Sequence, residues 1–237
     1  MPTQVVPLTS GEITVPAYYA GAVEASSGVV VLQEIFGVNA HIRDVTERFA
    51  QAGYSAIAPA LYQRQVPDFE TGYSPDDIEI GRRYKVRTQA DELLQDVQAA
   101  VDYLKQQGMQ KIGCVGFCFG GHVAYLAATL PDMAATASFY GAGIATWCPG
   151  DVGTTLARTP EISGELYGFF GKEDASIPAM EVDQIEAALQ LNGVPHQLFR
   201  YSGAGHGFFC DRRDSYRPEA AADAWERVLT LFARTLG

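Results

Sequence analysis

The stretch "KIGCVGFCFGGHVAYLAA", from Lys111 to Ala128, predicts a buried strand that turns sharply into a helix. Residues 112–115 have the apolar pattern of a strand end, and a glycine-rich pentapeptide separates them from the helical run. That pentapeptide, residues 116–120 (GFCFG), fits the nucleophile-elbow pattern G-x-S-x-G with cysteine in place of serine. The sequence therefore places the thiol of Cys118 at the tip of a strand-to-helix turn.

The chemistry of a nucleophile explains why glycines flank Cys118. Such a residue must leave the strand and stand clear of the sheet, which strains its own backbone. Glycines two positions away on either side prevent clashes between the strand and the returning helix. The turn also sets Cys118 at a helix N-terminus, where the positive end of the helix dipole favours a thiolate. The amide of Phe119 is free to face an oxyanion, because first-turn amides have no partner within the helix.

Two other interpretations of this stretch compete with a nucleophile. A dinucleotide-binding loop fits poorly, because the glycines at 113, 116, 120 and 121 do not give G-x-G-x-x-G and the stretch lies mid-chain. A packed core residue is the commoner role for a cysteine. The position of Cys118 between two phenylalanines at a strand-to-helix break nevertheless favours a reactive thiol.

The rest of the chain alternates strands with helices. Because such alternation is typical of a mostly parallel sheet covered on both faces, we expect one α/β domain over residues 1–237. Ligands of these sheets bind beyond the carboxyl ends of the strands. The further predicted strands are residues 12–20, 28–34, 55–59, 134–143 and 164–174, and residues 196–209 form a last strand that runs into a glycine-rich loop. The further predicted helices are 40–51, 82–106, 178–191 and 218–236, and residues 62–77 form a long loop.

Charge and composition narrow the possible partners. The formal net charge of −11 disfavours binding to nucleic acid or to an anionic membrane surface, and an anionic substrate would need local arginines. The start, MPTQVVPLTS, carries no secretion signal, and no apolar run reaches the roughly 18 residues of a membrane span. Four cysteines in a chain of this length favour free thiols in a reducing compartment. We expect a cytoplasmic protein, a monomer or weak homo-oligomer, that acts on a small molecule.

A base and an acid for the thiol follow it along the chain. A thiol nucleophile needs a base, and the base needs a carboxylate that orients it. Asp174 follows the predicted strand "LYGFFG", and His206 follows the predicted strand "HQLFRY" in a glycine-rich loop. This order of nucleophile, acid and histidine is that of α/β-hydrolases. Glu173 competes for the acid role, and an aspartate before a helix is also a common N-cap.

The remaining histidines give no metal-binding spacing. His41 and His122 fall in helical patterns, and His196 starts a strand. We therefore expect no metal and no cofactor.

The chain closely resembles the dienelactone hydrolase family over nearly its whole length. The resemblance rests on "QEIFGVNAHIRDVTERFAQAGYSAIAPALYQRQ", "VGFCFGGHVAYLAA" and "GAGHGFF". It implies an α/β-hydrolase that opens cyclic enol esters through a triad of Cys118, Asp174 and His206. It also implies that Glu34 is a carboxylate close to the thiol, and that the amides of Ile35 and Phe119 form the oxyanion hole.

Glu34 also stands out on physical grounds, since a charge at the end of an apolar strand is costly without a partner or a task. A salt bridge at the sheet edge is the ordinary explanation. Our hypothesis is that its negative charge favours the protonated thiol at rest, opposing the helix dipole and His206, and that Glu34 takes the thiol proton when an anionic substrate disturbs the site.

The family binds a substrate carboxylate with arginines, and here the match is looser. Cys210 stands about where one arginine is expected. The candidates are Arg212 and Arg213 after the histidine, and Arg82, Arg83 and Tyr84 near the start of the predicted long helix.

The predicted function is hydrolysis of a small activated lactone, a carboxylated dienelactone from aromatic ring breakdown, through a thioester acyl-enzyme. One alternative is a broader carboxylesterase or thioesterase on the same triad. Another, from a different class, is a redox-responsive or ligand-binding protein that uses the elbow cysteine without hydrolysis.

Overall fold

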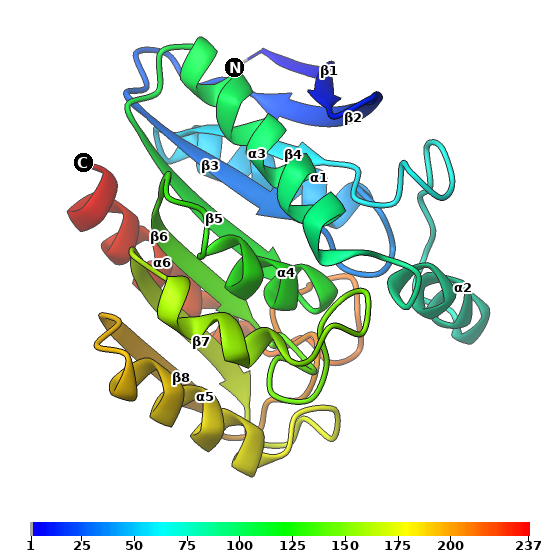
Figure 1. Ribbon diagram of the computed structural model, residues 1–237, viewed down its shortest axis with the longest axis vertical. Helices are drawn as coiled ribbons and strands as arrows, with labels where there is room; N and C mark the ends of the chain where they lie inside the picture. The colour runs from blue at the N-terminus through cyan, green and yellow to red at the C-terminus, as the bar shows by residue number, and fades with distance from the viewer. Residues whose placement is uncertain (1) are drawn as a thin grey trace.

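Residues 2–237 are described by the computed structural model of the protein, and their strands form one twisted sheet (Figure 1). The strands are β1 (Thr3–Ser10), β2 (Ile13–Ala20), β3 (Ser27–Leu32), β4 (Ser55–Pro59), β5 (Lys111–Phe117), β6 (Met133–Phe139), β7 (Glu165–Gly171) and β8 (His196–Tyr201). Over the described residues they lie in the order β1-β2-β4-β3-β5-β6-β7-β8. The pairings β1–β2 and β2–β4 are antiparallel, and those from β4 through β8 are parallel.

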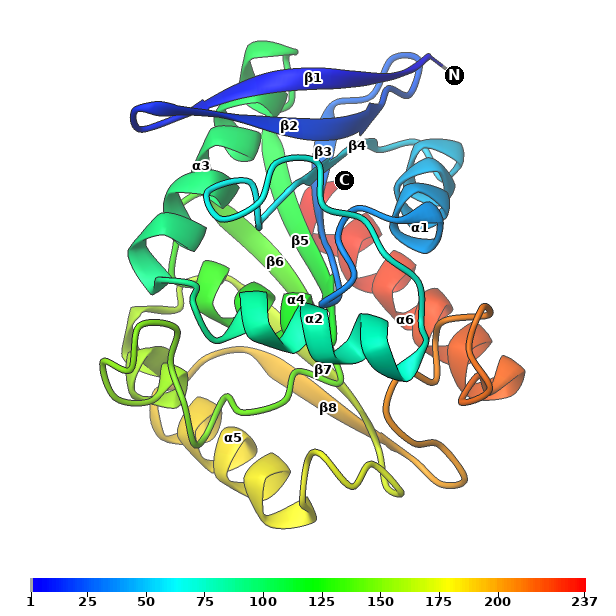
Figure 2. The same cartoon turned by 90° about the vertical axis from the view of Figure 1, so that its right-hand side faces the viewer.

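Helices cover both faces of the sheet. They are α1 (Ala40–Gln51), α2 (Pro75–Lys85), α3 (Ala90–Gln106), α4 (Phe119–Ala127), α5 (Ala179–Leu191), α6 (Pro218–Leu236) and the short 3₁₀ helix η1 (Thr155–Glu161). The view in Figure 2 shows α1 and α6 on one side of the sheet and α3, α4 and α5 on the other. The predicted mostly parallel α/β fold is confirmed.

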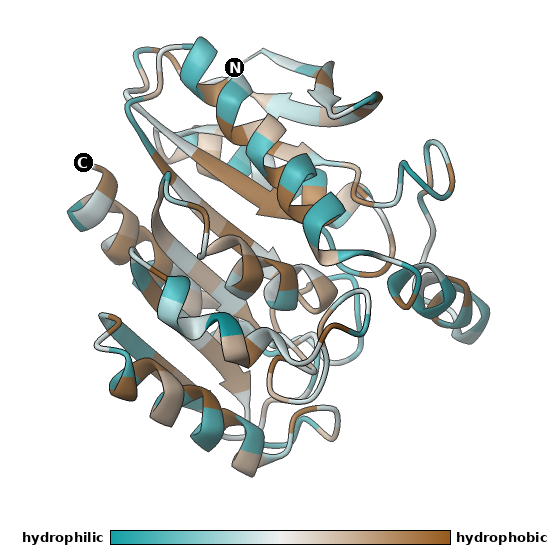
Figure 3. Cartoon of the chain, in the orientation of Figure 1, coloured by the Kyte–Doolittle hydropathy of each residue, from teal (hydrophilic) through white to brown (hydrophobic). Residues whose placement is uncertain are grey.

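The central strand β3 shows why both faces need a cover. All six of its residues are buried, and Figure 3 shows the strand as hydrophobic toward its carboxyl end. Val29 and Val31 pack in the cluster that includes α1 and α6, whereas Val30 and Leu32 pack in the cluster that includes α3 and α4. A strand with apolar side chains on both sides is stable only when it is buried on both faces, as in parallel sheets. β3 ends at Leu32, so Glu34 lies in the loop beyond the strand and not at its last position.

The long helix predicted over 82–106 is wrong, because two helices share that region. α2 begins earlier, at Pro75 within the predicted loop, where Ser74 and Asp77 form a reciprocal capping box. It ends at Lys85, whose carbonyl oxygen accepts hydrogen bonds from the amide and the hydroxyl of Thr88. These bonds compete with helical pairing, so the chain turns before α3 starts.

The first strand of the sheet was not among the predicted strands. β1 alternates exposed and buried side chains from Val5 to Ser10, and it contains Pro7. Proline is tolerated there because β1 is the edge strand of the sheet. In the part of the chain that the structure describes, no helix combines the length and the apolarity needed to cross a lipid bilayer.

Candidate active site

Cys118 occupies the sharp turn that the pentapeptide predicts. Its backbone has φ 56° and ψ −115°, a strained conformation for a residue with a side chain, between the end of β5 and the start of α4. Its amide donates to the Phe139 carbonyl at 3.0 Å, which ties the turn to β6. A Cβ atom at Gly116 would lie 1.9 Å from the Gly120 carbonyl oxygen, and one at Gly120 would lie 2.3 Å from the Leu32 carbonyl oxygen. The glycines on either side are therefore required by close approach of the backbone.

His206 and Asp174 meet at the same end of the sheet. His206 follows β8, Asp174 follows β7, and Nδ1 of the ring lies 2.8 Å from Oδ2 of the carboxylate. A carboxylate only accepts, so Nδ1–H donates and Nε2 is left for another partner. The other oxygen, Oδ1, accepts from the Ser176 amide at 2.8 Å, which fixes the carboxylate. Glu173 is exposed to solvent and takes no part in this pairing.

The imidazole of His206 is electrostatically coupled to Cys118. Burial alone would lower the pKa of His206, but the negative charge of a Cys118 thiolate and the hydrogen bond to Asp174 raise it to about 10. Both side chains line one cavity of about 470 Å³. The arrangement can therefore hold a positive imidazolium beside a developing thiolate.

The same cavity carries cations and the two predicted oxyanion residues. Ile35, from the loop after β3, and Phe119, the first residue of α4, both line it. Among the predicted arginines, Arg82 of α2 and Arg213 of the loop after β8 also line it. Three segments that are distant from Cys118 in the sequence thus line its cavity: the loop after β3, helix α2 and the loop after β8.

The other predicted substrate residues lie elsewhere. Arg83 is paired with Glu79 on the exposed face of α2. The ring of Tyr84 packs edge-on against Phe69, 4.8 Å between centroids. Arg212 lines a separate surface pocket that includes His41. None of these three borders the cavity among the described residues.

Glu34 lies behind the cavity wall and is fully buried. Its Oε1 accepts a hydrogen bond from Nη1 of Arg213 at 3.1 Å. The guanidinium of Arg213 also lies over the rings of Phe36 and Tyr73, 5.6 Å and 5.7 Å from their centroids. Arg213 therefore connects the buried carboxylate to the cavity.

Three residues of this region, Lys85, Trp147 and Tyr140, were not predicted from the sequence. Lys85 lines the cavity one turn after Arg82, and its Nζ lies 5.0 Å from the ring centroid of Trp147, which also lines it. Burial lowers the pKa of Lys85. Tyr140 has a positive φ of 37°, and its ring lies 5.2 Å from that of His206. Lys85 follows Arg82 by three residues, which on a helix places both on one face, and this spacing is the one feature of the sequence that could have indicated Lys85. Nothing in the sequence marks Trp147 or Tyr140.

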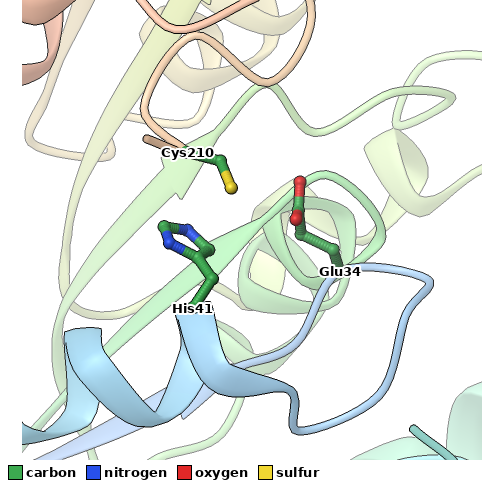
Figure 4. Close-up of side chains that lie close together, drawn as sticks. All are labelled: Glu34, His41 and Cys210. Atoms are coloured by element: carbon green, nitrogen blue, oxygen red, sulfur yellow. The ribbon is translucent and has the colours of Figure 1, made fainter. Parts of the chain in front are cut away.

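The remaining histidines have separate environments. His122 of α4 is fully buried, with Nδ1 2.9 Å from the Ala142 carbonyl oxygen and Nε2 2.7 Å from the Thr155 hydroxyl. Burial lowers the pKa of His122 to about 4. His41, at the start of α1, lies beside Glu34 and Cys210 (Figure 4). Together these three side chains could hold a metal ion.

Known proteins with similar sequences form a consistent group. The model of the dienelactone hydrolase family matches residues 15–236. A Synechocystis protein, provisionally named a carboxymethylenebutenolidase, is 51% identical over 239 residues, which cover 99% of this chain and 97% of its own. A Methylorubrum extorquens protein with the same provisional name is 34% identical and covers 96% of this chain and 78% of its own.

Solved structures extend the similarity to the fold. The crystal structure of a Klebsiella pneumoniae protein, provisionally described as a dienelactone hydrolase, has a TM-score of 0.88 at 31% identity and covers 98% of both chains. An acylaminoacyl peptidase of Pyrococcus horikoshii has a TM-score of 0.77 at 16% identity, over 99% of this chain and 41% of that one. The second likeness is one of fold alone.

Proposed function

Because the chain belongs to the dienelactone hydrolase family, we propose that it opens a small carboxylated enol lactone, with the Cys118 thiol as nucleophile. The family makes it a dienelactone hydrolase-like hydrolase. The observation that carries the proposal is the shared cavity: Cys118 and His206 line it together, and Asp174 holds the imidazole from behind.

The reaction proceeds in two halves. The Cys118 sulfur attacks the lactone carbonyl, and the amides of Ile35 and Phe119 stabilise the oxyanion. The C–O bond of the ring then breaks, the enolate leaves and takes a proton from solvent, and the acyl group stays on sulfur as a thioester. His206 next removes a proton from water, whose oxygen attacks the thioester and releases the carboxylate product and the thiol.

A thiol nucleophile restricts the substrate to activated esters. The tetrahedral intermediate expels whichever group leaves more easily, and a thiolate leaves well. An ordinary alkoxide therefore loses the competition and the step reverts, whereas a delocalised enolate competes. This selectivity favours enol lactones and thioesters over plain esters and amides.

The cations of the cavity support a carboxylate on the substrate. Arg82, Lys85 and Arg213 bring three positive charges to a cavity in a molecule of net charge −11. Charge-assisted hydrogen bonds from these side chains would hold an anion in place against the overall field. We further propose that Glu34, paired with Arg213 in the absence of substrate, receives the thiol proton when a substrate carboxylate competes for that guanidinium.

A comparison of two substrates tests the proposal. The wild-type protein should hydrolyse a carboxylated enol lactone, and it should hydrolyse an alkyl ester of the same acid no faster than the Cys118→Ala variant does. Equal turnover of both substrates would favour the broader esterase, and turnover retained by Cys118→Ala would exclude this thiol as the nucleophile. No turnover of either substrate would favour a redox-responsive or ligand-binding protein.

A further inference from the structure

A second group of reactive side chains lies behind the cavity wall. Glu34 comes from the loop after β3, His41 from the first turn of α1 and Cys210 from the loop after β8. Figure 4 shows the three side chains pointing toward one another. One carboxylate oxygen, one imidazole nitrogen and the sulfur all lie within 4.8 Å of one another.

These side chains are buried, and three of their polar atoms have no hydrogen-bond partner among the described residues. Their exposed fractions are 0% for Glu34, 2% for His41 and 0% for Cys210. Oε2 of Glu34 and both ring nitrogens of His41 make no hydrogen bond to any residue of the range 2–237. Asp211 is too far to supply one, because its Oδ1 lies 3.9 Å from Nδ1 of His41. Buried polar atoms without a partner are costly, which points to a missing ligand at their centre.

We propose that Glu34, His41 and Cys210 bind a thiophilic divalent cation of the Zn²⁺ class. Thiolate, imidazole and carboxylate are the donors that Zn²⁺ takes in proteins, whereas Mg²⁺ and Ca²⁺ prefer oxygen donors alone. Binding displaces the thiol proton of Cys210 to solvent, so that one thiolate and one carboxylate balance the charge of the ion. Three protein ligands leave a fourth position for water.

The geometry needs only a small contraction. Bonds of about 2.0–2.3 Å in a tetrahedral site place the ligand atoms roughly 3.3–3.8 Å apart, so atoms that now lie up to 4.8 Å apart must approach by about 1–1.5 Å. Rotation of the Glu34 side chain can supply this movement, because Arg213 holds only its other oxygen. The hydroxyl of Tyr73, 3.4 Å from the Cys210 sulfur, supports that ligand from outside the cluster.

Metal binding would also slow hydrolysis, a consequence that rests on the proposed function. A cation on Oε2 holds Glu34 in place and withdraws its charge from Arg213 and the thiol. Zn²⁺ at this site would then lower kcat without occupying the space that the lactone enters, since Glu34, His41 and Cys210 do not line the cavity.

Direct metal binding tests the site independently of catalysis. Metal-free protein is titrated with Zn²⁺ against a chromophoric chelator, and with Co²⁺ for thiolate-to-cobalt charge-transfer absorption. We expect the wild-type protein to bind one equivalent of Zn²⁺ per chain. The Cys118→Ser and Cys148→Ser variants should bind the same amount, and Cys148 is a buried cysteine elsewhere in the fold. Cys210→Ser should lose the cobalt band and bind Zn²⁺ more than about tenfold more weakly, the smallest loss usual even for residues that merely support a ligand.

The alternative sites give different outcomes. Loss of binding in Cys118→Ser with retention in Cys210→Ser would assign the metal to the catalytic thiol and overturn the proposal, as would the absence of binding in wild type. His41→Gln, with folding checked by circular dichroism, repeats the test without altering a thiol, and unchanged affinity in it would also contradict the site. In the activity assay Zn²⁺ should inhibit wild type and not Cys210→Ser.

Discussion

At the scale of single residues, the four candidate arginines form two matched pairs. Arg82 and Arg213 line the cavity, whereas their neighbours Arg83 and Arg212 do not. Arg82→Met and Arg213→Met should each raise the KM for a carboxylated lactone about 10- to 100-fold, because each removes one charge-assisted hydrogen bond to the substrate.

The neighbours provide the control for that experiment. Steady-state kinetics should show an unchanged KM in Arg83→Met and Arg212→Met, since both side chains lie away from the cavity. If all four variants keep the wild-type KM, the substrate carries no carboxylate that these residues bind.

The buried carboxylate of Glu34 gives a second prediction at this scale. Glu34→Gln removes the negative charge that pairs with Arg213, a residue that lines the cavity with Cys118. If Glu34 has the proposed role, this change favours the thiolate, so iodoacetamide should alkylate the free enzyme faster near neutral pH. Glu173→Gln is the matched control, because Glu173 is exposed and should leave the rate unchanged. An alkylation profile over pH that is identical in Glu34→Gln and wild type would refute the proposed role of Glu34.

At the scale of elements, the position of α2 depends on one glycine. Gly81 is buried against the loop after β3, and a Cβ atom there would lie 2.4 Å from the Ile35 carbonyl oxygen. Gly81→Ala should therefore displace α2 or the loop, although alanine is the better helix former by about 0.5–1 kcal/mol. We expect kcat/KM to fall by roughly tenfold or more, because displacements of about 1 Å near a reacting centre have effects up to about 100-fold.

A neighbouring substitution separates this effect from a general loss of helix. Ile80→Ala changes an exposed residue of the same helix and should leave kcat/KM unaltered. Wild-type kcat/KM in Gly81→Ala would show that close packing of α2 on the loop is unimportant for catalysis.

Elements with a strong local signal could be predicted, and those with a weak one could not. The helices at 40–51 and 218–236 match their predicted bounds because the apolar spacing is regular and Gly53 and Pro218 mark an end and a start. β1 escaped because its proline disguised an edge strand. The break between α2 and α3 escaped because it depends on hydrogen bonds from Thr88 and not on a glycine or a proline.

At the scale of the whole molecule, parallel topology made part of the site predictable. Side chains that follow parallel strands meet at one edge of the sheet, so Cys118, Asp174 and His206 could be expected to converge. The cluster of Glu34, His41 and Cys210 could not, because its members come from three segments whose approach depends on loop conformations. The spacing of these residues along the sequence therefore does not indicate a metal site.

The pH dependence of global stability gives a prediction for the folded molecule. The pKa of His122 falls from 6.5 to about 4 because the ring is buried, so the unfolded state binds a proton that the folded state refuses. Above about pH 6.5 the neutral ring costs the folded state nothing. As the pH falls from 6.5 toward 4, the free energy of unfolding decreases by about 3 kcal/mol. Denaturant unfolding at several pH values should show that the free energy of unfolding falls less steeply with decreasing pH in His122→Gln than in wild type. Parallel curves would mean that His122 titrates alike in both states.

Chemical modification of the thiol is the most direct measurement of whether Cys118 is the nucleophile. Iodoacetamide should inactivate the protein in proportion to the attachment of one carbamidomethyl group per chain. Peptide mass spectrometry should locate that group on Cys118. A saturating concentration of lactone should protect Cys118 from alkylation. Hydrolysis that survives complete modification of Cys118 would contradict the mechanism.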